Sequence, residues 1–214
     1  MDPEVLPTTP RSEPVPRLVD HELRRRQITD AVRRLIVRGG LDVVTFQSVA
    51  AEAGFSVSLV QYYCGTKKDL LLATHRSVME NVGTRFAQRR AEIGEDLTPR
   101  EAIRAVLTEL LPLDDQRQEE TIVLGVFGTA SVTGQGITPE ETLTASRLLV
   151  SILADQLERA PRLEPSVTRI DLVAELIAAA IAGISQGIIQ GHGTPDQALE
   201  LVDQQLDLIL GKQR

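Results

Sequence analysis

Three segments of the chain begin with one four-residue pattern, Thr-Pro-Xaa-Glu or Thr-Pro-Xaa-Gln, at Thr98, Thr138 and Thr194. In this pattern the threonine can cap a helix, the proline takes the first helical position, where its missing N–H costs nothing, and the fourth residue can complete a capping box. Thr66 begins a weaker box with aspartate in the fourth position. These starts and the apolar periodicity predict helices over residues 20–38, 67–93, 99–111, 116–132, 139–159, 167–190 and 195–210.

No segment shows the alternation of apolar and polar residues, bounded by turn residues, that is typical of a β-hairpin. We therefore expect an all-α fold of about nine helices, including two short helices argued below. The 214 residues are enough to bury a sizeable core without disulfides or metals. We expect a flexible, proline-rich arm over residues 1–16, a three-helix domain over residues 17–66 and a larger helical domain over residues 67–214.

The single cysteine, Cys64, excludes an intramolecular disulfide framework and a cysteine-based zinc site, and it favours a reducing compartment. The proline-rich N-terminus has no apolar segment of the kind found in secretory signals. Asp171, Glu175 and Gln186 interrupt the most apolar stretch, which argues against a membrane span. We expect a cytoplasmic protein that needs no cofactor or metal.

The net charge of −7 argues at first against a nucleic-acid partner, but the charge is unevenly distributed. Residues 17–76 contain ten lysines and arginines against six acidic residues, whereas residues 77–214 contain twelve against twenty-one. Such asymmetry indicates that the N-terminal part faces a polyanion and that the remainder does not.

Residues 45–63 meet the steric requirements of two short helices that cross at a tight turn. These are a small residue inside the first helix, a residue tolerant of positive φ at the turn, an apolar plug, a cap for the second helix and an apolar anchor four positions later. They are met by Ala50, Gly54, Phe55, Ser56 and Val60. The pattern predicts a helix-turn-helix unit, whose second helix enters the major groove of DNA.

Residues 35–72 resemble the DNA-binding domain of the tetracycline-repressor (TetR) family. The matching positions are Gly40, Thr45, Val49, Ala50, Ala53, Gly54, Phe55, Ser56, Tyr63, Lys67, Leu70 and Leu71. The chain departs from the family pattern at Ser58, at Val60-Gln61 and at Tyr63-Cys64, which bears on operator preference rather than on fold. The resemblance implies a transcriptional regulator with a C-terminal ligand-binding and dimerisation domain. We expect a repressor rather than an activator, because steric occlusion of a promoter needs no further surface, and we expect no enzymatic activity.

The resemblance places the DNA contacts on the second helix, the recognition helix and the start of the fourth helix. They are Gln47, Ser56, Val57, Ser58, Leu59, Gln61, Tyr62, Tyr63 and Lys67. Chemically, Gln61 can pair bidentately with adenine, and Val57 and Leu59 can contact a thymine methyl group. The phosphate contacts are assigned to Thr45, Ser56, Tyr63 and Lys67. The alternative for each is a solvated surface residue.

The basic run Arg24-Arg25-Arg26 allows two interpretations. These arginines can approach phosphates or a narrow minor groove, helped by Arg11 and Arg17, or they can form a solvated helix face.

The segment 167–190 is apolar over more than one stripe and carries small residues that permit close helix approach. With the amphipathic helix after it, it fits the two-helix surface through which TetR-like proteins dimerise; burial inside a monomer is the alternative. The expected interface residues are Leu172, Leu176, Ala179, Ala180, Gly183, Gly187, Leu201 and Leu206. A homodimer would bind double-stranded DNA at an inverted-repeat operator with half-sites roughly 34–36 Å apart.

The family resemblance also implies a small-molecule effector that shifts the population between DNA-competent and incompetent states. The expected pocket residues are Phe86, Leu107, Val123 and Phe127. The apolar segment 121–130 contains two glycines, which fits either a deformable helix beside a ligand or tight packing. The scarcity of aromatic residues after the N-terminal domain disfavours an aromatic cage.

Two other classes of function compete with this interpretation. An enzyme is disfavoured because His21, His75 and His192 are far apart in the chain and no phosphate-binding glycine loop or nucleophile elbow is present. A helical DNA-binding or interaction module without ligand control would lack effector-induced release from DNA. Cys64, near Lys67 and Lys68, is either a redox-sensitive thiol or a half-buried structural one.

Overall fold

The computed structural model describes residues 16–94, 96–161, 163 and 169–212. The expected arm over residues 1–16 lies outside these ranges except for Pro16, which begins the first helix. The described residues form ten helices and no strand, which confirms the all-α prediction. The helices are α1 (Pro16–Gly39), α2 (Phe46–Ala53), α3 (Val57–Cys64), α4 (Lys67–Ile93), α5 (Pro99–Leu110), α6 (Asp115–Val132), α7 (Pro139–Thr142), α8 (Thr144–Arg159), α9 (Ile170–Ile189) and α10 (Pro195–Leu210). α1 begins four residues earlier than predicted.

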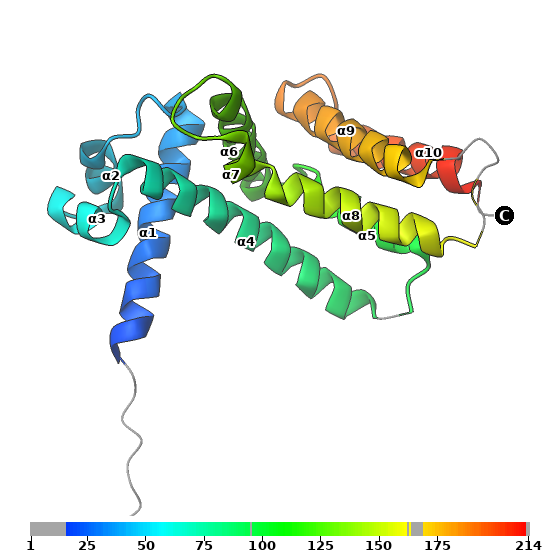
Figure 1. Cartoon of the computed structure of the whole chain (residues 1–214), viewed down its shortest axis with the longest axis horizontal. Coiled ribbons are helices and arrows are strands. Elements are labelled where there is room, and N and C mark those ends of the chain that lie inside the picture. Colours follow the sequence, from blue (N-terminus) through cyan, green and yellow to red (C-terminus); the bar gives the residue numbers. More distant parts are fainter. Residues whose placement is uncertain (1–15, 95, 162, 164–168, 213–214) are drawn as a thin grey trace, which may run out of the picture.

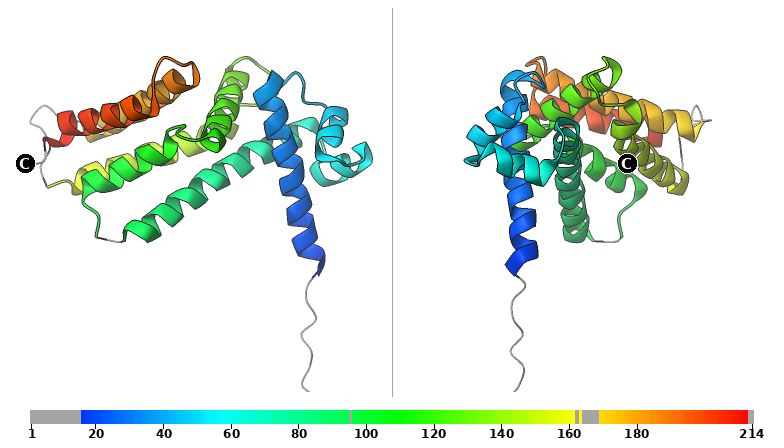
Figure 2. Two further views of the ribbon diagram at one scale, coloured as in Figure 1. Left: turned by 180° about the vertical axis from the view of Figure 1, so that it is seen from behind. Right: turned by 60° about the vertical axis from the view of Figure 1, so that its left-hand side comes forward.

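Helices α1, α2 and α3 gather at one end of the long helix α4, and we call residues 16–64 the head (Figure 1). α4 leads from the head into the C-terminal half, where α9 and α10 lie together on the side of the molecule away from the head (Figure 1). Seen from behind, α5 lies between α4 and α10, and it contacts both (Figure 2). α4 is therefore the continuous element that joins the head to the rest of the chain.

The predicted helix starts are confirmed at their caps. The side chains of Thr66, Thr98 and Thr194 each accept a hydrogen bond from the backbone N–H three residues later. At the fourth start, the Thr138 backbone N–H donates to the Glu141 carboxylate at 2.8 Å. The local pattern thus satisfies N–H groups that have no partner inside the helix.

The single helix predicted over residues 139–159 is wrong, because α7 and α8 are separate and Leu143 stands between them. The Thr142 hydroxyl donates to the Pro139 carbonyl oxygen at 3.2 Å, and the same oxygen accepts the Leu143 N–H at 2.8 Å. A side chain that competes for a backbone carbonyl in this way favours a helix end over a helix interior. The count is accordingly ten rather than nine.

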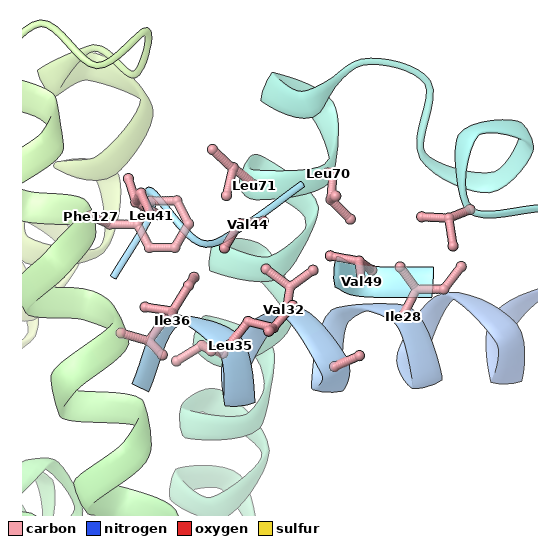
Figure 3. Close-up of a cluster of buried hydrophobic side chains, with 14 of the residues drawn as sticks. Ile28, Val32, Leu35, Ile36, Leu41, Val44, Val49, Leu70, Leu71 and Phe127 are labelled. Carbon is pink, nitrogen blue, oxygen red and sulfur yellow. The ribbon is translucent and has the colours of Figure 1, made fainter. Parts of the chain in front are cut away.

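Two hydrophobic clusters hold the fold. One lies in the head and at the start of α4, and it also contains Val123, Phe127 and Ala130 of α6. In Figure 3 Phe127 lies at the same end of this cluster as Leu41 and Ile36. The other cluster joins α5, α8, α9 and α10. α6 therefore packs its buried face into the core of the head.

Within the described residues, α9 alone is long and apolar enough to cross a membrane by length and composition. Its inner face, which carries Ala174, Ile177 and Ile181, packs into the C-terminal cluster. Its other face is exposed, with Leu172 and Leu176 more than half accessible. The outer face of α9 therefore carries large apolar side chains that the monomer leaves exposed.

Candidate nucleic-acid interface

The turn between α2 and α3 has the geometry that the sequence predicts. Gly54 ends α2 in the left-handed region at φ 70°, where a side chain would be strained. Ser56 then caps α3 by accepting the Leu59 backbone N–H at 3.2 Å. Thr45 caps α2 by accepting the Ser48 N–H at 3.0 Å, and the Ser48 hydroxyl oxygen accepts the Thr45 N–H in return. The hydroxyls of Thr45 and Ser56, both expected at phosphates, thus also hold the two helices in place.

α2 is tied to α1 by a carboxylate between two arginines. Arg34 donates to Glu52 at 2.6 Å, and Arg38 donates to the other oxygen of the same carboxylate. These hydrogen bonds lower the pKa of Glu52, with Arg34 the larger cause. These three residues fix α2, the helix expected to cross the DNA backbone, against α1, the longest helix of the head.

The recognition helix α3 presents one outward face. Ser58, Gln61 and Tyr62 are exposed, and their spacing of three and four residues places them on the same side. Tyr62 is 73% exposed, which is unusual for so large an aromatic residue. Gln47 on α2 is exposed as well. Four of the expected base-contacting residues are thus free to meet a groove.

Three of the other expected contacts, Val57, Leu59 and Tyr63, lie deeper. Val57 and Tyr63 pack against the hydrophobic cluster of the head, and Leu59 is half-buried. Lys67, the first residue of α4, is exposed and lies 3.5 Å from the Leu41 carbonyl oxygen through its Nζ atom. The structure therefore divides the predicted residues into an outward set and a set that also supports the helix.

The first turns of α1 support α3 through contacts that the sequence interpretation did not anticipate. The His21 ring lies 4.9 Å from the Tyr63 ring, and Tyr62 meets Tyr63 edge-on at 5.4 Å between ring centres. The Arg24 guanidinium stands 5.0 Å above the Phe55 ring. His21 and Arg24 thus support the turn and the recognition helix through ring contacts. The sequence signal for these contacts is a histidine and an arginine, three residues apart, that precede the helix-turn-helix unit.

Cys64 is half-buried at the end of α3. Burial raises the pKa of its thiol, and Arg25 offsets this only in part. A raised pKa lowers the thiolate fraction, which favours the structural interpretation of this cysteine over the redox-sensing one.

The expected interface residues on α9 and α10 mostly face outward. Leu172, Leu176 and Leu201 are each more than half exposed, Ala179 and Gly183 are exposed, and Ala180 and Gly187 line a groove between the two helices. Leu206 departs from this set, since it is fully buried in the chain's own core and cannot lie on an outer face. Leu208, which is 67% exposed and seven residues after Leu201, takes the outward position that the prediction missed.

The four expected pocket residues do not line a common cavity. Leu107 is fully buried in the C-terminal cluster, whereas Val123 and Phe127 are fully buried in the cluster of the head. Phe86 alone lines a described cavity, of about 300 Å³, between α4, α5 and α8. The glycines of the apolar segment 121–130 have open space around them, so close packing does not demand them.

Residues 28–74 match the family of bacterial regulatory proteins of the tetR type, and residues 99–211 match the C-terminal domain of BetI-type transcriptional repressors. The regulator BetI of Burkholderia cenocepacia is 29% identical over 92% of this chain and 98% of its own length. BetI of Brucella anthropi is 42% identical, over 44% of this chain and 46% of its own.

The fold is shared with a transcriptional regulator of Saccharomonospora viridis solved with choline, at a TM-score of 0.76 and 22% identity, over 89% of this chain and all of that one. Proteins of this family are DNA-binding regulators rather than enzymes. The chain belongs to the TetR family of transcriptional regulators and carries a C-terminal domain of the BetI repressor type.

Proposed function

We propose that the protein is a cytoplasmic homodimeric repressor that binds an inverted-repeat operator and is released by a small-molecule effector. The outward face of α3 carries the proposal, because Ser58, Gln61 and Tyr62 are exposed on a helix whose ends are both fixed. An exposed glutamine on a recognition helix suits the bidentate pairing with adenine. Val57, Leu59 and Tyr63 are proposed to add apolar and phosphate contacts at the edge of this face, and Thr45, Gln47, Ser56 and Lys67 complete the set.

Dimerisation is supported by the apolar residues left exposed on α9 and α10. We define the dimer face as Leu172, Leu176, Ala179, Ala180, Gly183, Gly187, Leu201 and Leu208. Large apolar patches of this kind on a water-soluble chain mark interaction surfaces, and a two-fold axis makes one patch complementary to itself. One short recognition helix makes too few contacts for specificity, so two related copies would read an inverted repeat.

Ligand control is supported by the way that the C-terminal half reaches the head. Glu119 of α6 lies 3.5 Å from Arg33 of α1, and Glu141 of α7 lies 2.9 Å from Lys68 of α4. A change in the packing of α4, α6 or α7 would therefore alter how the head is held. The regulator of Saccharomonospora viridis was solved with choline, so this fold accommodates a small molecule there.

Selection of random-sequence DNA with the full-length protein tests the proposal. We expect an enriched inverted repeat, and Gln61→Ala should weaken binding to it by about 1–3 kcal/mol, the value of one bidentate base contact. Gln88→Ala, which removes an exposed glutamine from α4, is the matched control and should bind as the wild type does. Titrations at two salt concentrations separate base contacts from phosphate contacts. Weak binding without sequence preference, or equal loss in both variants, would contradict the proposal.

A further inference from the structure

A cavity of about 300 Å³ lies between the C-terminal half of α4, α5 and the C-terminal half of α8. Its lining includes Phe86, Leu97, Val106 and Ile152, and among these Val106 is only 7% exposed. Ala102 and Ala105 of α5 keep the space open, since their side chains end at the β-carbon. One part of the cavity is thus apolar and suited to a hydrocarbon group.

The rest of the lining is cationic. Among the described lining residues, Arg89, Arg90 and Arg159 stand against one acidic residue, Asp155. Arg89 pairs with Glu92 at 3.3 Å. In the described part of the chain, no ion pair engages Arg90 or Arg159, and both are exposed. Two guanidinium groups that form no ion pair with a described residue therefore lie at the rim of an apolar cavity, an arrangement that suits a carboxylate with a hydrocarbon tail.

The same lining disfavours a quaternary ammonium ligand. Such cations are held by the faces of several aromatic rings. Only Phe86 supplies a ring here, because Phe127, the other aromatic residue beyond position 63, is buried in the cluster of the head. The arginines would also repel a cation at short range. The lining of this cavity thus does not suit a ligand such as choline, with which the regulator of Saccharomonospora viridis was solved.

We propose that the effector is an amphipathic anion, a short-chain carboxylate whose tail enters this cavity and whose head group meets Arg90 and Arg159. The assignment rests on the proposed ligand control and specifies the chemical class of the effector. A volume at the low end of the roughly 300–1,000 Å³ typical of ligand sites favours a chain of about eight carbons over a long acyl chain. Phe86, Arg89 and Arg90 belong to α4, the helix that begins directly after the recognition helix, so occupancy would act on the element that carries the head.

Titration calorimetry of the full-length protein with octanoate and with octyltrimethylammonium tests the proposal, because the two probes share a chain length and differ in the sign of the head group. We expect octanoate to bind and octyltrimethylammonium not to. Hexanoate should bind about fifteen-fold more weakly than octanoate, at about four-fold per buried methylene. The double variant Arg90→Gln/Arg159→Gln should weaken octanoate at least ten-fold.

Two further variants serve as controls, one for loss of an arginine outside the cavity and one for loss of cavity volume. Arg147→Gln removes an exposed arginine of α8 that lies outside the cavity, and it should leave octanoate binding unchanged. Ala105→Leu fills the cavity without a change of charge and should weaken octanoate as well. Equal binding of the two probes, absence of octanoate binding at millimolar concentration, or equal loss in Arg147→Gln and the double variant would overturn the assignment.

The operator selection separates this inference from the proposed function. Selective DNA binding that octanoate does not reverse, in a protein that does not bind octanoate, overturns the anion assignment and leaves the repressor intact. Octanoate binding with the expected variant pattern, in a protein without sequence-selective DNA binding, supports the cavity assignment and overturns the proposed function.

Discussion

The Arg85 guanidinium of α4 donates two hydrogen bonds, of 2.7 and 3.1 Å, to the Glu120 carboxylate of α6, and Glu120 is only 2% exposed. Gln116 donates a third hydrogen bond to the same carboxylate. Arg85 and Arg117 also lie 3.8 and 3.7 Å from Glu109 of α5. A buried network of both charges therefore joins α4, α5 and α6.

Removal of one partner from this network should cost more than removal of both. Glu120→Ala is expected to lower the free energy of unfolding by about 3–5 kcal/mol, because it leaves Arg85 largely buried without its carboxylate. The double variant Arg85→Met/Glu120→Leu should lose much less, since no charge is then stranded. Urea unfolding of both variants measures the difference. Equal losses would show that the pair acts through packing alone.

His75 of α4 packs against Phe127 of α6, with 5.2 Å between the ring centres, and burial lowers the pKa of this histidine. The folded protein thus takes up the proton at a lower pH than the unfolded chain does. Stability should be fully present above the unfolded pKa of about 6.5 and should fall as the pH drops toward the lower folded value. Urea midpoints from pH 8 to 5 should show this decrease in the wild type and a smaller one in His75→Gln. If the urea midpoints of the wild type and of His75→Gln fell in parallel with pH, His75 would not be the cause of the decrease.

The Glu52 carboxylate should make the stability of the fold depend on pH in a second, more acidic range. Its folded pKa is lowered by Arg34 first and by Arg38 next, so its contribution to stability is present above the unfolded pKa of about 4.3 and is lost as the pH falls through the folded value. Glu52→Gln should therefore be less stable than the wild type at pH 7, with the gap closing by pH 3. Thermal unfolding across this range checks it, and a gap independent of pH would point to lost packing instead.

The proposed dimer face can be tested by charge. Leu176→Glu places a carboxylate on a residue that is 62% exposed in the monomer, so it should leave the fold intact and weaken association strongly. Leu148→Glu on α8 makes the same change at 60% exposure outside the face and should leave the dimer unchanged. Sedimentation equilibrium separates the two. A wild type that sediments as a monomer, or dissociation by both variants, would argue against the assignment.

Local chemistry explains which parts of the structure could be predicted from the sequence. Gly54 and Ser56 act through their own backbone and side chain, so the turn and the cap of α3 follow from residue type at a given spacing. Helix periodicity also separated polar from apolar faces. It does not say which apolar face meets which neighbour, and for this reason the prediction placed the buried Leu206 on the outer face of α10 and omitted the exposed Leu208.

The tertiary contacts could not be predicted in the same way. Leu107 and Phe127 both belong to apolar stripes, yet they fall into different clusters because the path of α6 carries it toward the head. His21 and Tyr63 are more than forty residues apart in the chain, and only the fold brings their rings together. The outward face of α3 was predictable, whereas its support from α1 was not.

The position of Phe127 has a consequence for engineering. Exchanging DNA-binding regions between related regulators is a way to direct an existing regulator to a new promoter. A fusion point near residue 66, between two capped helices, is the obvious choice. Because Val123, Phe127 and Ala130 complete the hydrophobic cluster of the head, such a graft would set foreign side chains against this surface. A working hybrid would have to carry the matching residues of α6 with it, which makes the transferable unit discontinuous along the chain.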